Sequence, residues 1–145
     1  MCGAVWIALH LKPRRGIDDG ASRLRHILID YESHPPPDLA PVAYDETAVV
    51  IFVGPQQHRL PFPLVDAMQR LGSRGSYVKV AKMGHNALDF HLAFYLGERV
   101  RDDPGGVFRI VSKDSGFDPL IAHLQGRGLD VARWLDLDGG TPGEA

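Results

Sequence analysis

Runs of consecutive apolar residues along the chain predict buried β-strands. Residues 26–30, 47–54 and 107–112 form mostly apolar runs that are rich in β-branched side chains. Shorter runs at residues 77–80 and 130–134 predict two further strands. Strands that are apolar on both faces, rather than at alternate positions, are typical of parallel sheets covered on both sides. The pattern therefore predicts a mainly parallel central sheet.

Between these runs, apolar residues recur at the spacing of an amphipathic helix. The spacing predicts helices over residues 63–71, 86–100 and 119–125. Asn86 precedes the second helix as a predicted N-cap, and Pro119 falls in the first turn of the third. Because strands and helices alternate, we expect an α/β fold: a three-layer α/β/α sandwich.

The same pattern divides the chain into one domain and two flanking segments. Residues 1–24 carry loop-forming glycine and proline and are predicted as an N-terminal extension of uncertain order. Residues 25–136 hold the predicted strands and helices. Residues 137–145 are rich in glycine and are predicted as a disordered tail.

Composition and charge exclude several classes of protein. The formal net charge of −2 argues against a generally basic nucleic-acid binder, although a metal ion can still bring an acidic enzyme to nucleic acid. The single cysteine, Cys2, excludes a disulfide framework and favours a reducing, cytoplasmic setting. The early apolar stretch at residues 4–9 is too short to cross a bilayer, so no membrane association is expected.

Aspartates stand where the predicted strands end and the helices begin. Asp30 ends the first strand, Asp114 follows the fourth, and Asp118 and Asp89 lie at the starts of helices. Ligands of parallel sheets bind at the carboxyl ends of the strands, so these four side chains are expected to meet at one edge. Taken singly, each has a structural explanation: Asp30 and Asp114 as turn residues, and Asp89 as a favourable charge near a helix N-terminus. For Asp118, capping and metal binding are equally good explanations and are compatible with each other.

Crowded carboxylates repel one another, and a divalent cation removes the conflict. Hard oxygen ligands without thiolates favour Mg²⁺ or Mn²⁺ over Zn²⁺. We therefore predict catalytic, metal-binding roles for all four aspartates. Polar residues near the same edge are candidates for binding substrate: Ser112, Asn86, His85, Lys82 and Gln56.

Four segments of the chain resemble the PIN-like nuclease domain: residues 27–32, 52–54, 86–91 and 112–121. The resemblance implies an α/β/α sandwich and an Mg²⁺- or Mn²⁺-dependent nuclease that acts on RNA in preference to DNA. It implies the acidic roles of Asp30, Asp89, Asp114 and Asp118, and a hydroxyl role for Ser112. It also implies that a homodimer is plausible. One position departs from the pattern, because Ser33 stands where relatives commonly carry asparagine.

Three functions follow from these features. The leading prediction is a metal-dependent endoribonuclease. The alternative is a catalytically weak PIN-like module that binds nucleic acid or protein in a regulatory role. A phosphatase is the least favoured, because Asp30-Tyr31-Glu32 only approximates the paired aspartates that such an enzyme needs.

Overall fold

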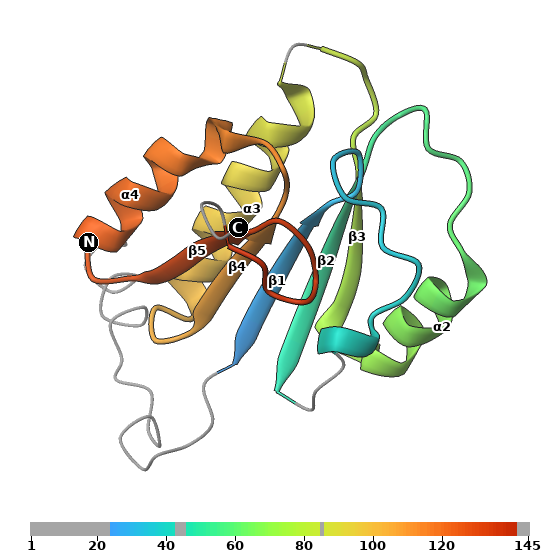
Figure 1. Ribbon diagram of the computed structural model, residues 1–145, viewed down its shortest axis with the longest axis horizontal. Coiled ribbons are helices and arrows are strands. Elements are labelled where there is room, and N and C mark those ends of the chain that lie inside the picture. Colours follow the sequence, from blue (N-terminus) through green and yellow to red (C-terminus); the bar gives the residue numbers. More distant parts are fainter. Residues whose placement is uncertain (1–23, 43–45, 85, 142–145) are drawn as a thin grey trace, which may run out of the picture.

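The described part of the chain forms a parallel sheet whose first strand lies at its centre (Figure 1). The computed structural model describes residues 24–42, 46–84 and 86–141. Within them the strand order is β3-β2-β1-β4-β5, and every neighbouring pair is parallel. The strands are β1 (Arg25–Asp30), β2 (Thr47–Val53), β3 (Gly75–Lys79), β4 (Val107–Val111) and β5 (Asp130–Trp134). The predicted parallel sheet is confirmed.

Helices cover both faces of this sheet (Figure 1). Helix α2 (Phe62–Leu71) packs on one face with the segment that follows β1. Helices α3 (Ala87–Asp102) and α4 (Asp118–Gly126) pack on the other. Short 3-10 turns complete the described elements: η2 (Ala40–Val42), η3 (Gly72–Arg74) and η4 (Ser115–Phe117). The three-layer α/β/α sandwich predicted from the sequence is therefore confirmed.

Because side chains alternate along β1, its last residue, Asp30, faces the layer formed by α3 and α4. Ile27 and Ile29 belong to the core beneath α2, whereas Leu28 belongs to the core beneath α3 and α4. Successive side chains of a strand point to opposite faces, so Asp30 shares the face of Leu28. By the same rule, Ser112 continues the face of Ile110 beyond the end of β4. Asp30 and Ser112 thus emerge side by side toward α3.

The strand order creates a crevice at this edge. From β1 the chain adds β2 and β3 on one side, and it then places β4 and β5 on the other. Loops leaving β1 and β4 therefore diverge, and such switch points are where open parallel sheets bind ligands. The register pairs Ile29 with Val111, so the residues just beyond them lie next to each other at the crevice.

Two local predictions differ from the structure. Asn86 does precede α3, but its backbone is left-handed, with φ 58°, and its side chain forms no capping hydrogen bond with the described residues. An N-cap side chain reaches the helix from an extended backbone, which Asn86 does not have. Residues 137–141 also differ from the predicted disordered tail: Leu137 is 5% exposed within the core, and the Leu135 amide donates to the Gly140 carbonyl.

Several predictions lie outside the described residues. They concern the extension at residues 1–23, His85, and the last residues, 142–145. Among the helices that the structure describes, none combines the length and the apolar character needed to cross a bilayer.

Candidate active site at the carboxyl edge of the sheet

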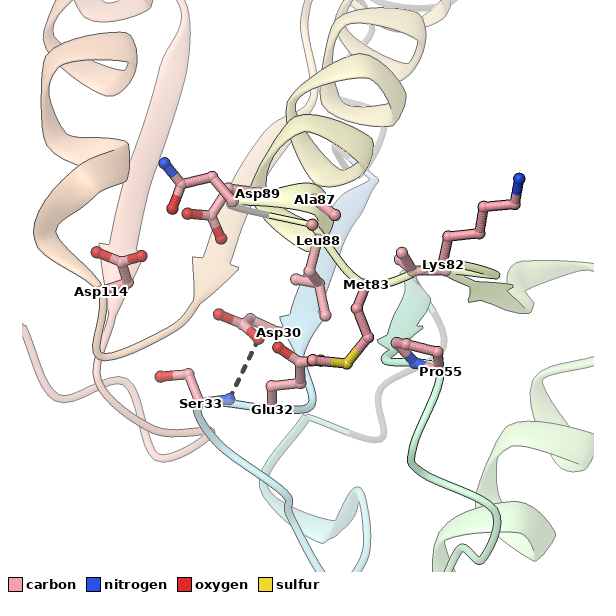
Figure 2. A pocket seen from close by; sticks show the side chains of 13 residues that line it. Asp30, Glu32, Ser33, Pro55, Lys82, Met83, Ala87, Leu88, Asp89 and Asp114 are labelled. Carbon is pink, nitrogen blue, oxygen red and sulfur yellow. Dashed lines mark hydrogen bonds between the residues drawn. The ribbon is translucent and has the colours of Figure 1, made fainter.

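Three of the four predicted aspartates line one cavity of about 330 Å³ at the carboxyl end of the sheet. Asp30 comes from the end of β1, Asp89 from the first turn of α3, and Asp114 from the loop after β4. Figure 2 shows their carboxylates facing a common space. We call this space the acidic cavity; its wall also includes Glu32, Ser33 and Lys82.

Asp30 is the most firmly held member of the acidic cavity. It is 4% exposed, and its Oδ2 accepts a hydrogen bond of 2.8 Å from the Ser112 hydroxyl. Its Oδ1 accepts from the Ser33 amide at 3.2 Å (Figure 2). Burial raises the pKa of Asp30 above its ordinary 3.8, while the hydrogen bonds from Ser112 and Ser33 oppose this rise. The carboxylate is therefore fixed in direction but costly to ionise.

Ser112 connects two of the aspartates. It is fully buried, and its hydroxyl oxygen accepts a 3.0 Å hydrogen bond from the Asp114 amide while its proton goes to Asp30. A hydroxyl both donates and accepts, so one small side chain fixes the Asp114 backbone relative to the Asp30 carboxylate. Ser112 was predicted to bind substrate, but its hydroxyl is already engaged within the protein.

Asp114 faces the solvent side of the cavity. It precedes η4 as a cap, and its Oδ1 accepts from the Gly116 amide at 2.8 Å. One carboxylate oxygen is thus occupied by the turn. Asp114 and Asp89 lie close enough to interact, since a hydrogen bond between them affects the pKa of Asp89.

Asp89 is the aspartate of the cluster whose ionisation is most strongly opposed by its surroundings. Its pKa is raised from 3.8 to about 6, first by burial, then by hydrogen bonding to and repulsion from Asp114. Repulsion from Asp30 and Glu32 adds to the rise. A carboxyl that resists ionisation beside other acids is common at functional sites.

Replacing Asp89 by asparagine is expected to stabilise the metal-free fold at neutral pH. Because the folded-state pKa is raised, ionised Asp89 destabilises the fold fully above pH 6, and the penalty fades as the pH falls toward 3.8. For a half-buried, partly screened group we expect a gain of about 1 kcal/mol in the free energy of unfolding. Urea titrations in EDTA at pH 8 and pH 4 measure it: the gain should appear at pH 8 and vanish at pH 4. An unchanged or lower stability at pH 8 would contradict the repulsion described here.

Asp118 lies apart from the other three aspartates. It is the first residue of α4, and both of its oxygens bind Arg133: Oδ1 to Nε at 2.7 Å and Oδ2 to Nη2 at 2.9 Å. The neighbouring guanidinium holds the pKa of Asp118 below its ordinary value. Asp118 does not line the acidic cavity. Asp118 is thus the first residue of α4 rather than its N-cap, and its carboxylate forms a bidentate ion pair; metal binding by Asp118 stays a prediction.

The predicted substrate-binding residues are divided in the structure. Lys82 and Asn86 line the acidic cavity, although Figure 2 shows Lys82 extending away from the carboxylates. Gln56 does not line it; its amide donates to the Met83 sulfur at 3.7 Å. His85 lies outside the described residues.

Ser33, the position that departs from the family pattern, forms two hydrogen bonds that connect parts of the cavity wall. Its amide donates to Asp30, and its hydroxyl accepts from the Lys113 amide at 2.6 Å. It therefore joins the loop after β1 to the loop after β4. A serine at this position is compatible with an organised site.

Three contributors to the site were not among the predicted site residues. Glu32 lines the cavity and lies against Gly54, where any Cβ would overlap the Glu32 carboxylate. Gln57 joins two strand ends: its oxygen accepts from the Gly54 amide, and its nitrogen donates to the Tyr31 carbonyl. Arg133 binds Asp118 and donates to the Ser112 carbonyl. The one available signal for Arg133 was a basic residue within a short apolar strand.

The acidic cavity has ligands of the type that bind a divalent cation, but the described side chains are not yet arranged as a complete metal site. Its donors are hard carboxylate oxygens, as Mg²⁺ and Mn²⁺ prefer. Among residues 24–42, 46–84 and 86–141, however, no three His, Cys, Asp or Glu side chains form a group that could hold a metal ion as they stand.

Comparison with known proteins agrees with this architecture. A search of curated proteins and a search of solved structures each found no match. The family model of the PIN domain matches residues 24–134, a segment that contains the five strands that the structure describes and every aspartate discussed above. The match covers most of the sequence, and the chain therefore belongs to the PIN domain family.

Proposed function

We propose that this protein is a metal-dependent endoribonuclease that hydrolyses RNA phosphodiester bonds at the acidic cavity. PIN domains are generally nucleases, and those nucleases typically use divalent metals. The observation that carries the proposal is the convergence of Asp30, Asp89 and Asp114 on one cavity at the switch point of the sheet. The preference for RNA and a cytoplasmic location are parts of the same proposal.

The carboxylates of the cavity suit a hard divalent cation. The pKa of Asp89 is raised because negative charge has gathered around it, and a bound cation would offset that charge. Asp30, Asp89 and Asp114 would hold the ion. Since these side chains do not form a finished cluster, binding has to draw them together, which the exposed Asp114 can do by turning about its side-chain bonds. Bound Mg²⁺ or Mn²⁺ would supply charge neutralisation and activation of water for phosphodiester hydrolysis.

The protein's own residues perform three tasks in this proposal. Ser112 and the Ser33 amide keep the Asp30 carboxylate directed into the cavity. The Ser112 hydroxyl also fixes the Asp114 backbone. The ion pair between Asp118 and Arg133 holds the Ser112 carbonyl in place from beneath, so Asp118 supports the site rather than ligating metal.

The proposal is tested by incubating labelled single-stranded RNA and DNA with the full chain in Mg²⁺, Mn²⁺ or EDTA. We expect internal cleavage of RNA with either cation, no cleavage in EDTA, and fragments that end in 5′-phosphate and 3′-hydroxyl groups. DNA cleavage without RNA cleavage would contradict the substrate class. Cleavage that persists in EDTA would contradict the metal requirement.

A regulatory binding module is the second candidate. It is favoured by one observation: the described acidic side chains do not form a metal group as they stand. A folded protein that binds RNA with the same affinity in EDTA as in Mg²⁺, and cleaves neither nucleic acid, would support this candidate against the nuclease.

A further inference from the structure

A second hollow of about 380 Å³ lies beside the acidic cavity and shares part of its wall. Asp89, Asp114 and Asn86 line both spaces. The remaining wall of the second space is mostly apolar and comes from α3, η4 and the start of α4: Phe90, Ala93, Gly116, Phe117 and Leu120. We call it the aromatic hollow. The aspartates thus separate an acidic space from an apolar one.

Phe90 gives the aromatic hollow a solvent-exposed aromatic wall. Its side chain is 70% exposed, whereas Phe117 on the other side of the hollow is 3% exposed. Phe90 follows Asp89 directly, so its position relative to the carboxylates is set by the backbone of α3. Exposure of a single ring is ordinary; what distinguishes Phe90 from the similarly exposed Phe94 is that it lines a hollow together with Asp89 and Asp114.

Asn86 adds a polar group at the shared wall. Its side chain makes no capping hydrogen bond to the described part of α3, and it lies exposed at the start of that helix. A primary amide offers both donors and an acceptor. An apolar slot bounded by one ring and one amide is the combination by which proteins bind unstacked bases.

We propose that the aromatic hollow holds a nucleobase of single-stranded RNA, that of a nucleotide adjoining the scissile phosphate. The inference rests on the proposed ribonuclease function. The scissile phosphate would be held beside Asp89 and Asp114 by the divalent cation that they bind, the neighbouring base stacks on Phe90, and Asn86 meets the edge of that base. Stacking on an aromatic ring is sequence-tolerant, so this subsite favours single-stranded RNA without selecting a strict sequence. It also gives an acidic protein affinity that does not depend on basic residues.

The α3 helix offers a matched pair of variants for the test. Phe90 and Phe94 are one turn apart and similarly exposed, at 70% and 62%. Phe94 is not among the described residues that line either space. Phe90→Ala removes the proposed stacking surface, Phe90→Trp keeps it, and Phe94→Ala removes an equivalent ring outside it. None of the three changes alters a buried side chain.

The experiment combines these variants with RNA that lacks a single base. We expect Phe90→Ala to weaken single-stranded RNA cleavage in Mg²⁺ by roughly 10-fold in kcat/KM, while Phe90→Trp recovers most of that loss and Phe94→Ala, outside the hollow, stays near wild type. Removing the base on one side of the scissile phosphate should cost the wild type a similar factor and cost Phe90→Ala nothing further. Fluorescence anisotropy with Ca²⁺ in place of Mg²⁺ measures the same losses as binding, independently of turnover.

Four results would overturn the inference. Equal losses from Phe90→Ala and Phe94→Ala would assign the effect to the helix surface in general. A wild-type dimer that becomes a monomer in Phe90→Ala, measured by light scattering, would assign the ring to pairing with a second copy of the chain. Wild-type protein that neither binds nor cleaves RNA would remove the proposed function itself, whereas cleavage that is indifferent to Phe90 would remove the subsite alone.

Discussion

Replacing Asp30 by asparagine is expected to lower metal-dependent RNA cleavage by about 100-fold or more without unfolding the protein. Loss of residues that merely orient metal ligands costs about 10- to 100-fold, and a ligand itself should cost at least as much. Asparagine has nearly the same shape as aspartate, and its oxygen can still accept from Ser112 or Ser33. Because burial raises the pKa of Asp30, loss of its charge removes an unfavourable term from the folded state.

Two measurements on one preparation separate the chemistry from the fold. Cleavage rates in Mg²⁺ give the activity, and thermal unfolding in EDTA gives the stability, for which we expect an unchanged or higher Tm. Asp66→Asn is a suitable control, since Asp66 lies on α2 in an exposed ion pair with Arg70. The control should keep both activity and stability. Full activity in Asp30→Asn would remove the acidic cavity as the catalytic site.

Asp118→Ala is expected to act in the opposite way, by destabilising the fold. Arg133 is 6% exposed and loses its bidentate partner, which leaves a buried guanidinium whose remaining hydrogen bond within the described residues goes to the Ser112 carbonyl. Removing one partner of a fully buried pair costs about 3–5 kcal/mol, but Asp118 is half-exposed, so we expect about 2 kcal/mol. In a domain of this size such a loss lowers Tm by roughly 6 °C.

The pH dependence identifies the ion pair as the cause. Arg133 lowers the pKa of Asp118, so the pair stabilises the fold above the ordinary value of 3.8, and this contribution is lost as the pH falls through the lowered folded-state pKa. The Tm difference between wild type and Asp118→Ala should therefore be full at pH 7 and shrink at strongly acidic pH. Below its own unfolding temperature the variant should retain most of its RNA cleavage. Complete loss of cleavage from a well-folded Asp118→Ala protein would restore Asp118 as a metal ligand.

These two expectations differ for aspartates that look alike in the sequence. Asp114 and Asp118 are four residues apart in the same loop-to-helix connection, and both stand beside turn-forming residues. Their different surroundings come from strand β5, which brings Arg133 beneath one of them. No local pattern around Asp118 encodes a partner that lies fifteen residues later.

The layers of this protein follow from local patterns in its sequence. Continuous apolar runs specify strands buried on both faces, helical spacing specifies the covering helices, and alternation of the two specifies a parallel sheet. Asp30 was also predictable, because the last residue of a buried parallel strand lies at the ligand-binding edge. These features depend on short-range periodicity, which a single chain displays directly.

The partners of the polar residues, in contrast, became visible in the folded chain alone. In the fold, the Ser112 hydroxyl donates to Asp30, and Asp118 forms an ion pair with Arg133. Asn86 has a left-handed backbone and lies between the acidic cavity and the aromatic hollow. The fold also leaves Phe90 exposed beside the acids while burying Phe117 across the hollow. Such contacts join segments that are far apart in the chain. They depend on which loops the strand order brings together, and short-range sequence patterns do not encode that order.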